Sequence, residues 1–130
     1  MNSNRAELLK EYISGNYAPI LMENKYLALL PKYTEIDANS PLEEFNGYYN
    51  DRGEFLPPKW FDEANENVLL VIKDIDKVQK EDQKKIIELL KYRKVSNFSL
   101  NKEVIIFVTC ENLNFDFISE DVLSLTIQII

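Results

Sequence analysis

The sequence predicts an α/β fold with three layers, in which helices flank a mostly parallel sheet of about five strands. Two observations support this. Five apolar segments of strand length are spread over the 130 residues, and helical segments separate several of them. Two of the five, 68–72 and 104–109, are continuously apolar, which is typical of parallel strands buried on both faces. We expect residues 1–130 to form a single domain.

The chain is predicted to open with a helix and then a strand. Residues 4–14 place their apolar side chains on one helical face, with Asn4 as the expected N-cap and Gly15 as the expected stop. The short apolar run 18–22 follows and predicts a buried strand.

The next part of the chain is less regular. Residues 25–30 fit a helix or a strand equally well, whereas the alternating pattern over 33–37 predicts a second strand. Residues 39–67 contain most of the prolines and are expected to be irregular. Within them, 48–55 predicts a hairpin with turn residues between aromatic flanks, and 58–64 predicts a short helix with a proline in its first turn.

The second half has a clearer pattern. Strands are predicted at 68–72, 104–109 and 123–130, and a short helix is expected before the last of them. Residues 80–92 predict a helix, because acidic residues lie in its first turn and basic residues at its end. Its inner face is expected to consist of Gln83, Ile86, Ile87 and Leu90.

Composition excludes several kinds of site and partner. The chain has one cysteine, Cys110, and no histidine, which excludes Ser-His-Asp triads, Cys-His pairs and ordinary zinc sites. A net charge of −7 disfavours binding to nucleic acid. No apolar run reaches the roughly 20 residues needed to span a bilayer, and no signal-peptide core follows the N-terminus. We therefore expect a cytoplasmic protein without a membrane partner.

Polar side chains follow the two most apolar strands. Residues 73–78 come after the first, and residues 109–112 come after the second. Ligand sites of parallel sheets lie at the carboxyl ends of their strands. These two segments are therefore the first place to look for a functional site.

The same segments resemble the AAA+ ATPases, nearest to the MoxR-type branch. In that family an apolar strand ends in Asp-Glu-Ile-Asp-Lys-Val, the Walker B box, and a later apolar strand ends in a polar sensor residue. This chain has similar runs in the same order and spacing at 69–78, 88–95 and 105–112, and a similar upstream segment at 47–58. The resemblance covers 45–130 better than 1–44, and it implies a P-loop NTPase-like core.

Several departures from the family pattern imply a truncated core without ATPase activity. Lys73 stands where the family has the magnesium-binding Asp, and Asp74 stands where it has the Glu that orients water. No Gly-x-x-x-x-Gly-Lys-Ser/Thr motif is present, and residues 23–26 occupy its expected place without a glycine. We also expect no helical lid of the kind that follows the final strand in the family. We predict no catalytic residue, no metal and no cofactor.

Four polar residues are the candidates for a vestigial nucleotide or metal site: Asp74, Asp76, Glu111 and Asn112. Asp74 and Asp76 fit a magnesium pair. Lys73 and Lys77 beside them favour another interpretation, in which Asp74 is a remnant at the strand end and Asp76 caps a helix or turn. Glu111 and Asn112 fit a sensor, or side chains that satisfy loop backbone groups. For Cys110, a small half-buried side chain is favoured over a reactive thiol.

Two clusters are candidates for binding a partner. The first is aromatic and lies in the irregular segment, where it fits either the core or an interface: Tyr48, Tyr49, Phe55, Trp60 and Phe61. In AAA+ relatives the comparable region faces a neighbouring subunit or substrate. The second is a basic patch, which fits either a solvated helix face or a docking surface: Lys84, Lys85, Lys91, Arg93 and Lys94.

The leading hypothesis is a non-catalytic, AAA+-like module that binds or regulates another protein. The resemblance suggests that this partner is an ATPase subunit. A homodimer is open as well. The alternative is a nucleotide-binding, non-hydrolysing subunit that completes a site with an ATPase partner. A third hypothesis is an unrelated enzyme that uses carboxylates such as Asp74, Asp76 and Glu111, which requires a cleft and a raised pKa.

Overall fold

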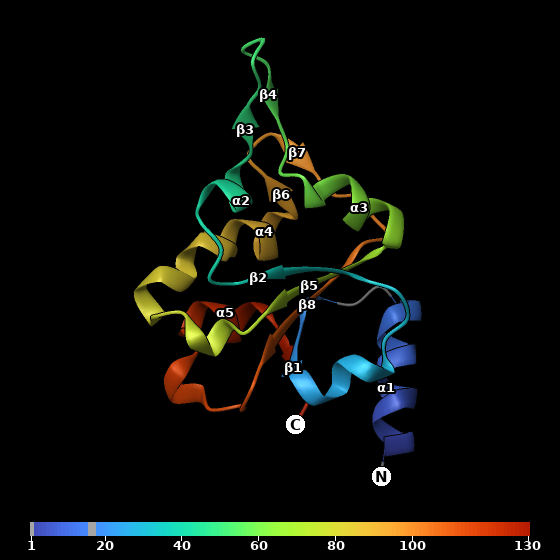
Figure 1. Ribbon diagram of the computed structural model, residues 1–130. Helices are drawn as coiled ribbons and strands as arrows, with labels where there is room; N and C mark the ends of the chain where they lie inside the picture. Colours follow the sequence, from blue (N-terminus) through green and yellow to red (C-terminus); the bar gives the residue numbers. More distant parts are fainter. Residues whose placement is uncertain (1, 16–17) are drawn as a thin grey trace.

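The computed structural model describes residues 2–15 and 18–130, and at its centre is one parallel sheet (Figure 1). Its five strands run in the order β2, β5, β8, β1, β9, and every neighbouring pair is parallel. The predicted α/β class and strand number are therefore confirmed. The strands are β1 (Ile20–Glu23), β2 (Thr34–Asp37), β5 (Leu69–Lys73), β8 (Ile105–Cys110) and β9 (Ile127–Gln128).

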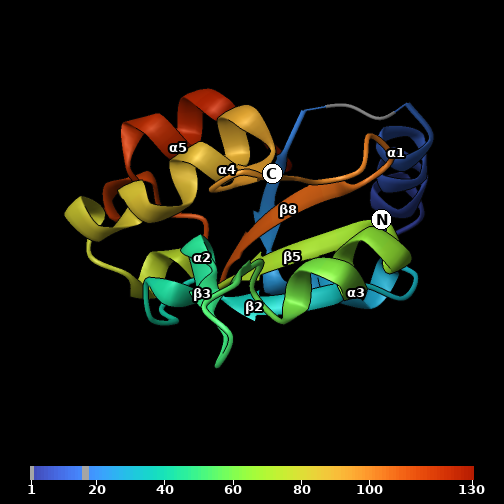
Figure 2. The same cartoon turned by 90° about the horizontal axis from the view of Figure 1, so that it is seen from above.

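Helices cover both faces of the sheet and complete the three layers (Figure 2). One face is covered by α1 (Asn2–Gly15) and the 3-10 helix η1 (Asn24–Leu29). The opposite face is covered by a larger set: α2 (Glu43–Asn46), α3 (Trp60–Asn67), η2 (Ile75–Lys77), η3 (Lys80–Ile86), α4 (Ile87–Tyr92) and α5 (Glu120–Leu125). A further 3-10 turn, η4 (Phe115–Phe117), precedes α5.

The central strands divide the apolar core in two. Successive side chains of a strand point to opposite faces, so Leu70 and Ile72 of β5 join the cluster under α2–α5. Leu69 and Val71 of the same strand join the cluster under α1 and η1. Every residue of β8 is buried. This double burial explains why the sequence of both strands is continuously apolar.

Two hairpins extend the architecture beyond the sheet. In the first, β3 (Tyr48–Tyr49) pairs with β4 (Phe55–Leu56), as predicted, and it projects from the body at the top of Figure 1. Gly47 opens it with φ 97°, and a Cβ atom there would lie 2.6 Å from the Leu56 carbonyl oxygen, so only glycine fits. The second hairpin joins β6 (Lys94–Val95) to β7 (Phe98–Ser99).

Near the C-terminus the strand predicted for 123–130 is wrong over much of its length. Residues up to Leu125 belong to α5, and β9 has only two residues. Ser119 is the N-cap of this helix, and its hydroxyl accepts a hydrogen bond from the Val122 N–H. Glu120 and Asp121 follow in the first turn, where negative charge stabilises a helix. These start signals outweigh the apolar pattern that suggested a strand.

Two predicted helices differ in detail. The segment 80–92 begins as the 3-10 helix η3 and becomes α-helical only at Ile87. Its buried side chains Gln83 and Ile86 are three residues apart, the spacing that places side chains on one face of a 3-10 helix. Helix α1 begins at Asn2, so Asn4 lies inside the helix and is not its N-cap, and Gly15 is its last residue.

Residue Val68, at the end of α3, has a left-handed backbone with φ 58°. This conformation costs an L-residue about 1–2 kcal/mol and is most unfavourable for a β-branched side chain. We expect Val68→Gly to raise the free energy of unfolding by about 1 kcal/mol, because glycine is the usual residue at this position. Urea denaturation measures the change. Val68→Ala is the control, and a Gly variant no more stable than the Ala variant would contradict the prediction.

Within residues 2–15 and 18–130, no helix combines the length and the apolar character that crossing a membrane requires.

Candidate functional site

The strongest candidate site lies where three neighbouring strands end. Strand β8 lies between β1 and β5, and all three run in the same direction. The segments that follow them therefore meet at one side of the sheet. We call this place the carboxyl edge, and it consists of residues 23–25, 74–77 and 111–113.

Asp74 turns the chain away from β5 and contacts the segment after β1. Its backbone is left-handed with φ 65°, a conformation that Asp tolerates better than most residues. Its Oδ1 accepts a hydrogen bond of 2.7 Å from the Asn24 side-chain amide. Its Oδ2 lies 3.8 Å from the Lys77 ammonium. Both carboxylate oxygens of Asp74 thus have partners within the chain.

Asp76 joins the segments after β5 and β8. Its carboxylate accepts hydrogen bonds from the Glu111 N–H at 3.2 Å and from the Asn112 N–H at 3.4 Å. The cap predicted for Asp76 is therefore not in its own turn, because its carboxylate binds backbone groups of the neighbouring segment. The four predicted residues Asp74, Asp76, Glu111 and Asn112 do lie together at the carboxyl edge.

Glu23 is a member of this edge that the sequence analysis did not assign to the site. Its Oε2 accepts a 3.0 Å hydrogen bond from the Leu113 N–H, and its Oε1 lies 3.3 Å from the Lys25 ammonium. The Leu113 hydrogen bond is the main cause that lowers the pKa of Glu23, against the opposing effect of burial. Glu23 is the last residue of β1 and Asn24 follows it, so the strand-end rule that selected Asp74 would also have selected them.

Lys77 supplies a second positive charge at the carboxyl edge, in addition to Lys25. Its ammonium lies 3.3 Å from Glu111 as well as near Asp74. The hydrogen bond to Glu111 and the charge of Asp74 raise the pKa of Lys77. Among the described residues, no group of three or more His, Cys, Asp or Glu side chains has the arrangement of a metal site.

The segment after β1 does not form a phosphate cradle. It is the 3-10 helix η1, and none of the three glycines of the chain lies between β1 and β2. A cradle needs free backbone N–H groups at a glycine-rich turn that opens a helix. Here Glu23 and Asn24 occupy that place with side chains that bind the neighbouring segments.

Cys110 ends β8 beside this edge and is fully buried. Its Sγ donates a weak hydrogen bond of 3.7 Å to the Met22 carbonyl oxygen. Burial, with the negative charges of Asp76, Glu23 and Asp74, raises the pKa of the thiol to about 12. The half-buried side chain expected from the sequence is thus a buried one.

We expect Cys110 of the native protein to resist iodoacetamide at pH 8. The thiolate is the reactive form, and a pKa raised to about 12 leaves the thiol protonated at this pH. In urea the same thiol regains an ordinary pKa near 8.5 and should be alkylated completely. Mass spectrometry measures both reactions. Equal labelling rates for native and unfolded protein would contradict the prediction.

The aromatic cluster is divided between surface and core. Tyr49 is 72% exposed and Tyr48 is 38% exposed, both on the projecting hairpin. Trp60 and Phe61 are buried at 6% and 7%, so the partner-binding role predicted for these two side chains is wrong. They pack under α3 because the amphipathic helix turns them toward the sheet.

Phe55 connects the two parts of the cluster. Its ring centroid lies 4.9 Å from that of Tyr49 and 5.6 Å from that of Phe98. Phe98 in turn lies 6.1 Å from Phe61, and Phe61 lies 6.1 Å from Trp60. A continuous row of rings therefore runs from the exposed Tyr49 to the core.

The basic patch is also divided. Lys85 donates a 3.0 Å hydrogen bond to the Ser40 carbonyl oxygen and lies over the Phe45 ring. Arg93 donates to three carbonyl oxygens of the segment 101–104, and burial lowers its pKa. These internal contacts favour a structural role for Lys85 and Arg93 over docking. Lys84, Lys91 and Lys94 are exposed and line one groove.

Comparisons with known proteins establish the fold. No protein-family model and no curated protein matches the sequence. Among solved structures, the chain is similar to the crystal structure of NtrX from Brucella abortus, with a TM-score of 0.58 and 16% sequence identity. The match covers 95% of this chain and 35% of that chain, so this chain spans about a third of the length of NtrX. At this identity the likeness shows the fold alone.

Proposed function

We propose that this chain is a degenerate AAA+-like core that binds another protein and does not hydrolyse nucleotide. One observation carries the proposal. A triphosphate and its magnesium would bind at the carboxyl edge, but there the polar side chains form hydrogen bonds with neighbouring segments of the same chain. Asn24 donates to Asp74, Asp76 accepts from Glu111 and Asn112, and Glu23 accepts from Leu113. These hydrogen bonds leave neither a cradle nor a free carboxylate pair.

The sheet order supports the AAA+-like part of the proposal. The strand with the Walker B-like run is β5, and its neighbour β8 has the sensor-like run. The next neighbour is β1, after which the family has its phosphate loop. Phosphoryl transfer needs a phosphate cradle, a metal ligand and a water-orienting group around one reacting atom. The three strands are adjacent as that chemistry requires, while Lys73 and the segment 23–26 depart from it.

The projecting hairpin supports the protein-binding part. It exposes two consecutive tyrosines, Tyr48 and Tyr49, and aromatic side chains are enriched where proteins bind each other. Asn50 fixes the turn, because its side-chain oxygen accepts hydrogen bonds of 2.9 Å from the N–H groups of Arg52 and Glu54. We propose that this hairpin contacts the partner, and that the domain acts in the cytoplasm.

A nucleotide titration tests the first half of the proposal. We expect no saturable binding of a fluorescent ATP analogue with magnesium at micromolar concentrations, and no phosphate release above background. Saturable micromolar binding without hydrolysis would overturn the proposal in favour of a nucleotide-binding subunit. The variants Asp74→Asn and Asp76→Asn should leave the titration unchanged, because neither carboxylate is proposed to hold magnesium.

The second half is tested by quantitative capture of partners from the native cell. We expect Tyr48→Ser with Tyr49→Ser to lose the proteins that the unchanged chain retains. Phe115→Ser is the matched control, because it removes an aromatic side chain that is 48% exposed outside the hairpin. Equal capture by both variants would exclude the hairpin as the contact. Light scattering of the purified chain then separates a partner protein from a homodimer.

A further inference from the structure

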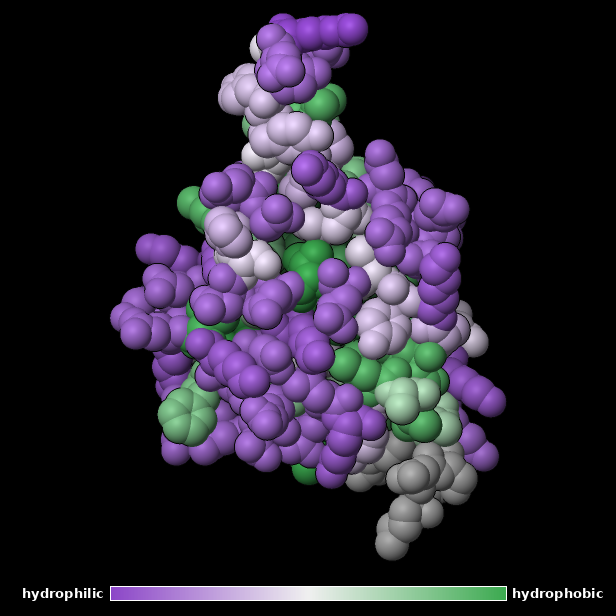
Figure 3. Space-filling view, viewed as in Figure 1, coloured by the Kyte–Doolittle hydropathy of each residue, from purple (hydrophilic) through white to green (hydrophobic). Residues whose placement is uncertain are grey.

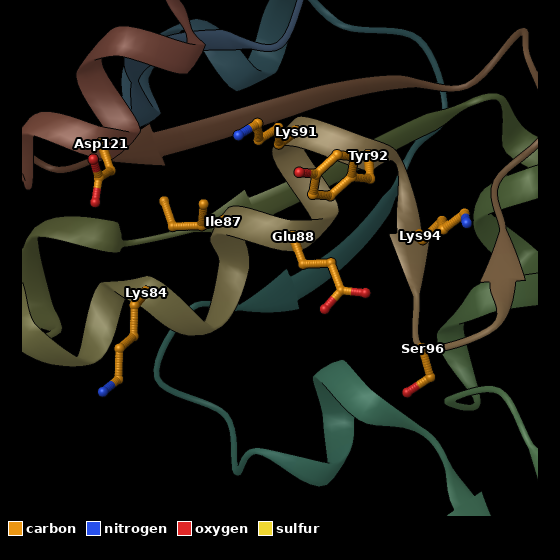
Figure 4. Close-up of a pocket in the computed structure, with 8 residues that line it drawn as sticks. All are labelled: Lys84, Ile87, Glu88, Lys91, Tyr92, Lys94, Ser96 and Asp121. Atoms are coloured by element: carbon orange, nitrogen blue, oxygen red, sulfur yellow. The ribbon is translucent and has the colours of Figure 1, made fainter.

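An open groove of about 630 Å³ lies between helices α4 and α5 and the turn after β6. Figure 4 shows its eight lining side chains, which come from η3, α4, α5 and the β6 hairpin. They are Lys84, Ile87, Glu88, Lys91, Tyr92, Lys94, Ser96 and Asp121. The carboxyl edge contributes none of them, so the groove is a second, separate feature of the molecule.

The three lysines of the groove are available to a ligand. Lys84, Lys91 and Lys94 are exposed, and none forms an ion pair with a carboxylate of the described residues. The lining also contains two carboxylates, Glu88 and Asp121, so the net charge of the groove is slightly positive. The whole chain, in contrast, has a net charge of −7. An acidic ligand would be repelled by most of the surface and attracted here.

The groove also offers an apolar contact. Tyr92 is 60% exposed although it is a large aromatic residue, and its ring lies 5.3 Å from the Lys91 ammonium. Ile87 is partly buried and packs against the core below the groove. An aromatic surface next to ammonium groups binds ligands that combine an apolar side chain with negative charge. Figure 3 shows a largely hydrophilic face with several separate apolar patches.

We propose that this groove binds an acidic peptide segment of a partner protein. Acidic side chains of the segment pair with Lys84, Lys91 and Lys94, and one apolar side chain packs on Tyr92 and Ile87. The proposal rests on the proposed protein-binding function and names the chemistry of one partner segment. Glu88 opposes the segment and limits how strongly it binds.

Fluorescence anisotropy tests the proposal with the full chain. The probe is a fluorescein-labelled peptide of glutamates with one central leucine, and the same peptide with glutamines is the control probe. We expect saturable binding of the glutamate peptide that weakens as salt increases, and no binding of the glutamine peptide. The absence of saturable glutamate-peptide binding at low salt would overturn the proposal.

Charge variants locate the binding. We expect Lys84→Gln, Lys91→Gln and Lys94→Gln together to weaken it at least tenfold. The matched control replaces three other exposed lysines and gives the same net charge, so it should change binding less than twofold: Lys10→Gln, Lys32→Gln and Lys59→Gln. Equal losses for both sets would overturn the proposal, because the attraction would then be nonspecific. All six lysines are exposed, and unchanged thermal melting confirms that the variants fold.

Two further variants test the geometry of the groove, because they should change the affinity for the peptide in opposite directions. Tyr92→Ser should weaken binding of the leucine-containing peptide several-fold and leave a serine-containing analogue unaffected. Glu88→Gln should tighten binding, because it removes the repulsion inside the groove. A single-stranded oligothymidine that binds more tightly than the peptide, and loses binding in the Lys84, Lys91 and Lys94 variant, would overturn the proposal in favour of nucleic acid. The nucleotide titration is independent, so its failure and a failure here are distinguishable.

Discussion

Replacing Gln83 with Leu is expected to lower the free energy of unfolding by about 3 kcal/mol, the largest effect of any single polar change considered. Gln83 is fully buried, and its amide nitrogen donates to the carbonyl oxygens of Ile75, Val78 and Phe117. Its Oε1 accepts from the Ser119 N–H at 2.7 Å. Leucine keeps a similar volume but leaves buried backbone groups without partners, each of which costs about 1–3 kcal/mol.

Urea denaturation measures this change through the fluorescence of Trp60, the only tryptophan and a buried one. Gln79→Leu is the matched control, because Gln79 is an exposed glutamine just before the same helix. We expect the control to lie within about 0.5 kcal/mol of the unchanged protein. A Gln83→Leu variant that loses less than about 1 kcal/mol would show that water replaces the side-chain amide.

A second large effect is expected for Arg93→Met, which should cost about 2 kcal/mol. Arg93 is the C-cap that follows α4, and its Nη2 donates to the carbonyl oxygens of Asn101, Lys102 and Val104. These bonds hold the segment that leads into β8. Hydrogen bonds to charged groups contribute about 1.5–3 kcal/mol, and methionine keeps the length of the side chain while removing its donors.

The control for this change is Lys94→Met, the next residue, which is exposed and has no ion pair with a described carboxylate. It should change the stability by less than about 0.5 kcal/mol. Arg93→Lys should recover only part of the loss, because an ammonium on a shorter side chain cannot reproduce the geometry of the guanidinium. Equal stability of the Met variants at both positions would exclude the proposed role of Arg93.

The fold was predictable from the sequence where burial is complete. Strands β5 and β8 are apolar over most of their length because helices cover both of their faces, and that pattern identified them. The last strand was not predictable, since the same apolar run continues from α5 into β9. There the hydroxyl of Ser119 and the acidic first turn decide the start of the helix.

The candidate site was predictable in its position but not in its contacts. The strand-end rule placed Asp74, Asp76 and Glu111 together, because it depends only on the parallel direction of the strands. It could not show that Asn24 binds Asp74, since these residues are 50 positions apart. Nor could the aromatic composition of the segment show that Trp60 is buried and Tyr49 exposed. These two residues lie at opposite ends of one row of rings.

This row of rings has a consequence for the thermodynamics of association. A free two-stranded hairpin is marginally stable in water and would lose conformational entropy when a partner orders it. Here Phe55 packs on Phe98, and the Ser96 hydroxyl donates a 2.6 Å hydrogen bond to the Asn46 carbonyl oxygen at the base. The hairpin is thus already ordered before a partner binds. When a partner binds Tyr49, little of the binding free energy would therefore be lost in ordering the hairpin.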